Sequence, residues 1–256
     1  MRSVVVVPTY EEGENVEPLL RAIRIAAPEA AILVVDDNSP DGTAEVAERV
    51  GVEVGGVDVL RRAAKDGLGN AYRAGFAHAL ATGAEALVTF DADFSHDPAL
   101  IPVLLAELES GADLVIGSRY VPGGCTPDWP LHRRALSRYG NRYTGFVLSL
   151  PVRDATSGFR AYRASTLHAI GYGTTKANGY AFMTEMAFRI VSWGGAIVEV
   201  PIEFRDRRWG TSKMSARIIV ESMARVSWWG AREGLRRGRG RDRTRARVAG
   251  SSPPQV

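Results

Sequence analysis

Residues 86–93 read Ala-Leu-Val-Thr-Phe-Asp-Ala-Asp, a short apolar run that ends directly in two carboxylates. Two earlier stretches have the same pattern, in which polar residues follow an apolar run. Val4–Val7 leads into Pro8-Thr9-Tyr10-Glu11-Glu12, and Ala31–Val35 leads into Asp36-Asp37. Short β-branched runs of this kind are typical of strands buried on both faces of a parallel sheet. Open sheets of that class bind ligands at the carboxyl ends of their strands, so these polar ends predict the functional edge.

The segments between these strands have helical spacing. Expected helices cover residues 14–26, 43–50, 69–81 and 97–109, and expected strands cover 4–7, 31–35, 57–60, 86–90 and 114–116. Asp97 and Pro98 suit the N-cap and first position of the helix that they open. Regular alternation of strand and helix predicts an α/β fold, a Rossmann-like, mostly parallel sheet with helices on both faces.

The second half of the chain is less regular. It predicts a Gly/Pro-rich loop over 118–130 and then helices over 131–150, 181–193 and 215–235. Strands are expected over 157–163 and 196–204, the latter with Pro201 only at an edge or bulge. We therefore expect one domain over 1–230, including an amphipathic helix from about 215, and an arginine-rich, disordered tail over 231–256.

Composition excludes several classes of protein. The chain has 256 residues, 45% of them apolar and 24% charged, so it can bury a sizeable core. Its one cysteine excludes an internal disulfide, and its four histidines have no metal-ligand spacing. We expect neither a signal peptide nor a transmembrane helix, because no long apolar window occurs, and a cytosolic compartment follows as the default.

The charge is unevenly distributed. Residues 231–247 hold eight arginines against Glu233 and Asp242, a net of +6, whereas the whole chain carries only +3. The remaining residues therefore sum to −3. Such a tail is either a solvated end or a segment that binds a polyanion, which could be a membrane surface or nucleic acid.

Three groups of residues could carry chemistry. Asp91 and Asp93 are spaced to face one divalent cation, Mg²⁺ or Mn²⁺. Asp36 and Asp37 are adjacent, so we expect one to face a ligand and the other to fix the loop. Arg119, Arg133-Arg134 and Arg207 with Lys213 form basic clusters suited to phosphate groups. Gly67-Leu68-Gly69 allows either a close ligand approach or tight packing.

These stretches resemble a known family. Pro8-Thr9-Tyr10-x-Glu12, Val35-Asp36-Asp37-Asn38-Ser39 and Phe90-Asp91-Ala92-Asp93 resemble family 2 glycosyltransferases with the GT-A fold. Further motifs resemble the polyprenol-phosphate (dolichol-phosphate) mannosyltransferases among them. These motifs are Gly67-Leu68-Gly69-x-Ala71-Tyr72, Gly117-Ser118-Arg119-Tyr120, Arg133-x3-Ser137, Asp154-x-Thr156-Ser157-Gly158-Phe159-Arg160 and Asp206-Arg207-x2-Gly210-x-Ser212-Lys213.

The resemblance implies roles for individual residues. Pro8, Tyr10, Glu12 and Asp37 would line the donor nucleotide pocket, and Asp91, Ala92 and Asp93 would meet the donor diphosphate. Asp91 and Asp93 would hold the metal, with Ser95 standing where many members have Gln. Arg119, Arg133 and Ser137 would receive the acceptor phosphate. Asp93, Arg207 and Lys213 would be catalytic, the last two by closing over the donor diphosphate.

The implied reaction moves mannose from GDP-mannose to a polyprenyl monophosphate by metal-assisted, inverting displacement. Alternatives are a polyprenyl-phosphate glucosyl synthase using UDP-glucose, a nucleotidyltransferase, and a nucleic-acid-binding protein acting through the arginine tail. The lipid acceptor implies a peripheral enzyme at the cytoplasmic face of a membrane. Trp228, Trp229 and the tail, or a separate anchoring protein, would attach it.

Overall fold

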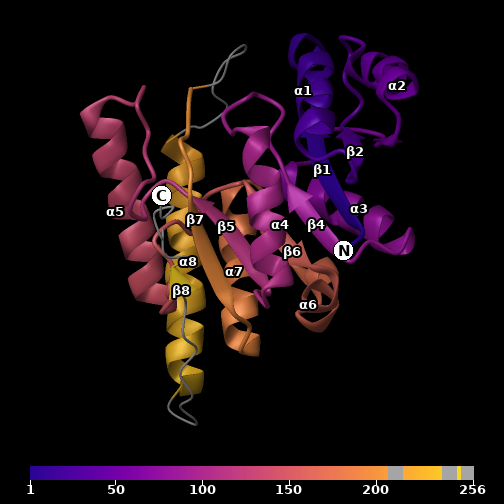
Figure 1. Ribbon diagram of the computed structural model, residues 1–256. Coiled ribbons are helices and arrows are strands. Elements are labelled where there is room, and N and C mark those ends of the chain that lie inside the picture. The colour runs from indigo at the N-terminus through magenta and orange to yellow at the C-terminus, as the bar shows by residue number, and fades with distance from the viewer. Residues whose placement is uncertain (207–215, 238–246, 249–256) are drawn as a thin grey trace, which may run out of the picture.

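Eight strands form one sheet in the computed structural model, which describes residues 1–206, 216–237 and 247–248 (Figure 1). The strand order is β3-β2-β1-β4-β6-β5-β7-β8. The strands are β1 (Ser3–Thr9), β2 (Ala31–Asp36), β3 (Val57–Arg61), β4 (Ala86–Thr89), β5 (Leu114–Ser118), β6 (Arg160–Arg163), β7 (Ile197–Pro201) and β8 (Arg247–Val248).

The first four strands confirm the predicted parallel arrangement. β1 lies between β2 and β4 and is parallel to both, with Thr9 opposite Asp36 at the carboxyl end. Alternate valines of β1 serve different cores, because successive side chains of a strand point to opposite faces. Val4 and Val6 pack on one face, whereas Val5 and Val7 pack on the other.

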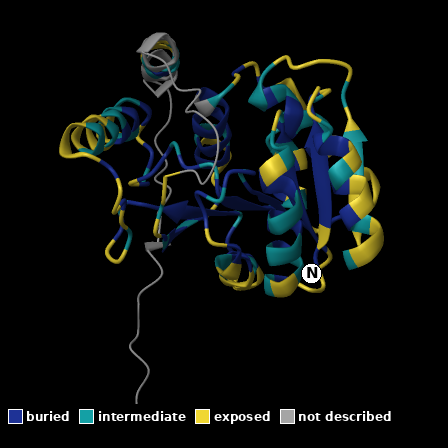
Figure 2. Ribbon diagram, turned by 90° about the horizontal axis from the view of Figure 1, so that it is seen from above, coloured by how far each residue is buried: buried dark blue, intermediate teal, exposed yellow. Residues whose placement is uncertain are grey.

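The helices cover both faces, as the sequence predicts. α1 (Gly13–Ala26), α2 (Thr43–Val54) and α4 (Ile101–Glu109) supply apolar side chains to one core. α3 (Leu68–Ala81), α5 (Leu131–Leu148), α6 (Ala164–Ala169), α7 (Tyr180–Trp193) and α8 (Ala216–Arg237) pack on the other. Figure 2 shows the buried sheet between these more exposed layers. Short 3₁₀ turns η1 (Pro98–Leu100) and η2 (Tyr172–Thr174) complete the described elements.

β6 is the antiparallel member of the sheet. It is inserted between β4 and β5 and runs against both. The expected strand over 157–163 shrinks to four residues, because the Asp154 carboxylate accepts a hydrogen bond from the Ser157 backbone N–H at 3.1 Å and holds a turn there. This turn lies beside the carboxyl end of β4, where the acidic pair begins.

The second half departs from expectation at several boundaries. α5 ends at Leu148 because Ser149 adopts a left-handed conformation with φ 50°. α6 and β8 were not expected. β7 ends at Pro201, which is compatible with proline because a strand end needs no further ladder donor.

α8 continues to Arg237, past the expected domain boundary at residue 230. Arginine, glutamate and leucine favour helix, so the basic composition of residues 231–237 does not end it. Most of the remaining tail lies outside the described residues. The expected disorder concerns that part of the chain. Among the helices that the structure describes, none has the length and apolar character needed to cross a bilayer.

Candidate active site

One edge of the sheet gathers the polar strand ends. The segments that follow β1, β2, β4, β5 and β7 all emerge there, because these strands are parallel. The antiparallel β6 brings the preceding residues 154–159 to the same edge. Residues far apart in the sequence thus meet around one cavity of about 410 Å³.

Asp91, Asp93 and Ser95, the three residues of the predicted metal site, all line this cavity. Phe94 between them has a left-handed φ of 59°, which costs a non-glycine residue about 1–2 kcal/mol. The resulting turn directs the Ser95 backbone N–H to Asp93 Oδ1 at 3.1 Å. Gly158 packs against Asp91, where an added Cβ would stand 2.8 Å from Oδ2.

The donor set suits a hard divalent cation. Two carboxylates and a hydroxyl offer only oxygen ligands, which Mg²⁺ and Mn²⁺ prefer. Within the described residues, no three His, Cys, Asp or Glu side chains converge to hold a metal. A cation bound here would therefore need oxygen atoms from substrate or water to complete its coordination.

Arg119 enters the cavity from the end of β5, held by a buried carboxylate. Its Nε and Nη2 donate to the two oxygens of Asp154, each at 2.7 Å, and Nη2 also donates to Thr156 Oγ1 at 2.8 Å. Burial raises the pKa of Asp154, but the charge and hydrogen bonds of Arg119 outweigh burial and hold that pKa below its usual range. The guanidinium is thus fixed in direction.

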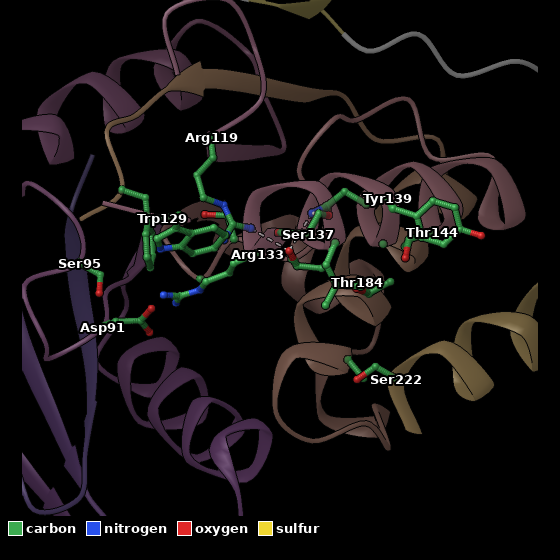
Figure 3. A pocket seen from close by; sticks show the side chains of 18 of the residues that line it. Asp91, Ser95, Arg119, Trp129, Arg133, Ser137, Tyr139, Thr144, Thr184 and Ser222 are labelled. Atoms are coloured by element: carbon green, nitrogen blue, oxygen red, sulfur yellow. Dashed lines mark hydrogen bonds between the residues drawn. The ribbon is translucent and has the colours of Figure 1, made fainter. Parts of the chain in front are cut away.

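Arg133 lies across an indole from Arg119 (Figure 3). Its guanidinium stands 4.1 Å from the Trp129 ring centre, and the Arg119 guanidinium stands 5.4 Å from the same ring. Asp206 Oδ1 accepts from Arg133 Nη1 at 2.8 Å and from Trp129 Nε1 at 3.0 Å. Ser137, one helical turn after Arg133, accepts from the Tyr120 hydroxyl at 2.6 Å.

The cavity has a polar end and a more apolar end. Figure 3 shows Asp91 and Ser95 at one end, the two arginines in the middle, and Tyr139 and Thr144 at the other. Helices α5, α7 and α8 form the far end. Its apolar lining comes from Leu136, Tyr139, Ala181, Met223 and Val226.

The predicted nucleotide residues lie outside this cavity, at the ends of β1 and β2. Asp36 fixes the loop, as expected of one aspartate of the pair, by accepting from Thr9 Oγ1 at 2.9 Å and from the Ser39 backbone N–H at 2.8 Å. Asp37 pairs with Arg62 at 2.5 Å. Burial nevertheless raises the pKa of Asp37.

The other predicted nucleotide residues are near this pair in the sheet. Pro8 stands opposite Val35 in the register of β1 and β2. The Lys65 ammonium lies 3.7 Å from the Tyr10 ring centre, and Glu12 Oε2 accepts from Asn15 Nδ2 at 2.7 Å. Ala92, between the two aspartates in the sequence, is buried. Arg207 and Lys213 lie outside the described residues.

The glycines before α3 serve packing. A Cβ on Gly69 would stand 2.5 Å from the Ala177 carbonyl oxygen, and Gly67 has a φ of 106°. Of the two interpretations left open by the sequence, close contact with the loop before α7 is therefore the one observed.

Sequence reasoning missed several groups at this edge. Trp129 is uncharged, so a search for clusters of charged residues does not select it. Its position between two arginines becomes evident only in the fold. Arg62 directly follows β3 and could have been found by the strand-end argument used for the aspartates. His96, three residues beyond Asp93, is fully enclosed beside Asp91, although the histidine spacing gave no reason to select it.

The chain is similar in sequence to proteins that are already known. The model of glycosyl transferase family 2 matches residues 4–171. Polyprenol monophosphomannose synthase of Mycolicibacterium smegmatis is 44% identical, over 93% of this chain and 91% of that protein. Undecaprenyl-phosphate mannosyltransferase of Micrococcus luteus is 48% identical, over 92% of this chain and 98% of that protein.

Solved structures support the fold. Glucosyl-3-phosphoglycerate synthase from Mycobacterium tuberculosis, crystallised with Mn²⁺, UDP and glucosyl-3-phosphoglycerate, aligns with a TM-score of 0.60. The alignment covers 91% of this chain and 79% of that one, at 20% identity. At that identity the likeness shows a shared GT-A fold.

Proposed function

The chain belongs to glycosyl transferase family 2, and from that premise we propose that it transfers mannose from GDP-mannose to a polyprenyl monophosphate. The observation that carries the proposal is the cavity itself. It joins an acidic pair, two arginines and an apolar end in one continuous space. The names of the two relatives described above support the acceptor class and the sugar.

The middle of the cavity suits the acceptor phosphate. A phosphate monoester carries a charge of about −1.5 to −2 near neutral pH, and arginine binds such groups with directed hydrogen bonds. Arg119, Arg133 and Ser137 all line this space, and the guanidinium groups of both arginines lie within 5.4 Å of the Trp129 ring centre. The apolar end between α5, α7 and α8 would accommodate the first isoprene units.

The acidic end suits the donor diphosphate. Bound Mg²⁺ or Mn²⁺ would neutralise charge on the leaving nucleoside diphosphate. Asp91 and Asp93, with Ser95, would hold that ion, and Arg207 and Lys213 would add positive charge. Pro8, Tyr10, Glu12 and Asp37 would position the nucleoside. This division leaves the anomeric carbon between the acidic pair and the arginines.

The chain needs no side chain to deprotonate the nucleophile. The acceptor phosphate is already ionised, so the two arginines need only orient one of its oxygens towards the anomeric carbon. That oxygen forms the new bond as the bond to the diphosphate breaks, and the electron pair leaves with GDP. A single displacement inverts the α-linked donor and gives a β-linked product.

Membrane association follows from the acceptor. Leu136 and Tyr139 of α5 line the cavity and are also exposed. Phe146 of α5 and Trp228 of α8 are further exposed apolar side chains on two helices that contribute to its apolar end. The Arg232 guanidinium lies 5.1 Å from the Trp228 ring centre, an arrangement suited to an anionic membrane surface. We propose a peripheral enzyme on the cytoplasmic face.

A paired transfer assay tests the function. The purified chain receives polyprenyl phosphate in detergent, Mg²⁺, and either labelled GDP-mannose or labelled UDP-glucose. We expect label in the extractable lipid from GDP-mannose only. Asp93→Ala should abolish transfer, whereas Asp97→Ala, which removes only the cap before η1, should retain it.

The outcomes separate the parts of the proposal. Transfer from UDP-glucose alone would keep the fold and acceptor but replace the donor. An α-linked product would exclude single displacement. Absence of lipid label from both donors, with the wild-type chain folded and metal present, would contradict the proposed transfer.

A further inference from the structure

His96 is a buried imidazole with no hydrogen-bond partner in the part of the chain that the structure describes. Its side chain is 1% exposed, and neither Nδ1 nor Nε2 is hydrogen-bonded among the described residues. A buried polar group left unsatisfied costs about 1–3 kcal/mol of stability. Such a cost in a folded protein requires an explanation, and a role at a functional site is one of the known explanations.

The surroundings of His96 make its polarity more unusual. Phe90, Phe159 and Phe204 enclose the ring, with centroid separations of 5.9, 5.2 and 5.2 Å. A purely apolar side chain could fill the space between these three rings without the cost of burying polar nitrogen atoms. Packing alone therefore does not account for a histidine here.

One side of the ring meets the acidic pair. His96 Nε2 stands 3.4 Å from Asp91 Oδ2, within reach of a hydrogen bond but without the required alignment. From another direction the Tyr72 hydroxyl lies 3.4 Å from Asp91 Oδ1, and the Gly158 backbone packs against the same carboxylate. A small rotation of Asp91 would align Oδ2 with the imidazole N–H.

We propose that His96 is a positioning residue for Asp91, donating from Nε2 to Oδ2 and so holding the carboxylate in the orientation that takes a divalent cation. Its ring has no role in the transfer itself. Carboxylates that bind metals are commonly oriented by hydrogen bonds from neighbouring groups, and loss of such a group typically weakens metal binding about 10–100-fold. The proposal rests on the proposed function, because it takes Asp91 to be a metal ligand.

Two variants of similar size separate hydrogen bonding from packing. His96→Leu keeps an apolar filling of the cage but removes both nitrogens. His96→Gln places an amide N–H near the position of Nε2. His168→Gln is the matched control, because His168 is exposed on α6.

Binding of Mn²⁺ in the presence of GDP, followed by electron paramagnetic resonance of free Mn²⁺, is the main readout. We expect His96→Leu to weaken Mn²⁺ binding about 10–100-fold. His96→Gln should recover most of that affinity, and His168→Gln should bind as the wild type does. The melting temperature in EDTA is the second readout. His96→Leu should not lower it, because the aligned hydrogen bond to Asp91 is proposed only for the protein with its cation bound.

The results discriminate between the inference and its premise. Equal Mn²⁺ affinity of the wild type and His96→Leu would overturn the role of His96 and leave the proposed function intact. A melting temperature lowered equally in both His96 variants, with equally weakened Mn²⁺ binding, would indicate packing and also overturn it. Absence of Mn²⁺ binding to the wild type would overturn the metal site, and the inference with it.

Discussion

Asp154 is the fully buried carboxylate that keeps Arg119 directed into the cavity. Two hydrogen bonds of 2.7 Å join the side chains, and Asp154 Oδ2 also accepts from the Arg119 backbone N–H at 3.0 Å. Glu199 in turn accepts from the Asp154 backbone N–H at 2.9 Å. The position of the proposed phosphate-binding cation is therefore determined by residues that do not touch the phosphate.

Asp154→Asn should destabilise the protein strongly. It keeps the shape of the side chain but leaves a buried guanidinium without its charge partner, which typically costs about 3–5 kcal/mol. Urea denaturation at neutral pH measures the loss of unfolding free energy. Asp66→Asn, which alters an exposed ion pair with Arg62, is the control and should change stability by no more than about 1 kcal/mol.

The same pair predicts a pH dependence. The pKa of Asp154 is lower in the folded state than its ordinary value of 3.8, so the folded protein favours the ionised form. The resulting stabilisation is fully present above pH about 5 and is lost as the pH falls through 3.8 towards the folded-state pKa. The stability gap between wild type and Asp154→Asn should therefore narrow below pH 4. A gap that stays constant down to pH 2 would contradict the assigned ionisation.

At the residue scale, the sequence identified the charged residues of the cavity better than the uncharged side chains enclosed beside them. One cavity is lined by six of the polar residues for which the sequence suggested a common cleft: Asp91, Asp93, Ser95, Arg119, Arg133 and Ser137. Trp129 and His96 were missed because their significance lies in what surrounds them. No spacing pattern in the sequence indicates that an indole lies between two arginines or that three phenylalanines surround an imidazole.

At the scale of elements, hydrophobic periodicity predicted the helices and parallel strands of the first half. It could not predict that β6 is inserted antiparallel between β4 and β5, because strand direction depends on the path of the intervening chain. It also missed α6, whose six residues are too few for a helical pattern to emerge. The insertion matters for function, since it brings Gly158 against Asp91.

Helix α5 combines a cavity-lining face with an exposed apolar face. Tyr139, Tyr143 and Phe146 follow the i, i+4, i+7 spacing of one helical stripe. Tyr139 is 63% and Phe146 86% exposed, whereas the Tyr143 hydroxyl is 2.7 Å from Ser227 Oγ of α8. The stripe is thus continuous with the junction of α5 and α8 and suits shallow insertion into a membrane surface.

Phe146→Ser tests this surface without disturbing the core. We expect weaker binding to vesicles, because an exposed phenylalanine that inserts contributes about 1.5–3 kcal/mol of apolar burial. Ile25→Ser is the matched control, because Ile25 is 83% exposed on α1, which packs on the opposite face of the sheet. Vesicle sedimentation measures both. Equal loss in the two variants, or none in Phe146→Ser, would argue against a membrane role for α5.

At the scale of the whole molecule, charge is separated along the chain. Residues 231–247 carry a net +6 while the other residues sum to −3, so the cationic segment and the folded body would respond differently to an anionic surface. Residues 231–237 of that segment belong to α8, which packs beside α5 (Figure 1), and both helices carry exposed apolar side chains. Apolar insertion and electrostatic attraction would therefore act on one face.

Truncation after Arg237 separates the two contributions. The cut falls where α8 ends and removes five arginines and Asp242, a net of +4, together with β8. Each arginine near an anionic surface contributes about 1 kcal/mol, so binding to anionic vesicles should weaken markedly. The loss should shrink as salt is raised, because screening removes the electrostatic part.

Binding of the truncated chain to zwitterionic vesicles should match that of the full chain, since the exposed side chains of α5 and α8 remain. Transfer to a detergent-dispersed acceptor should also persist, because no residue that lines the cavity is removed. Melting temperatures of both proteins establish whether the loss of β8 affects folding. A truncated chain that is equally stable and binds anionic vesicles as tightly as the full chain would assign membrane attraction to the folded body. The truncated chain has a net charge of −1, because the cut removes +4 from a chain of +3, so electrostatic attraction to an anionic surface is not expected of it. Apolar insertion would then be the force to measure next.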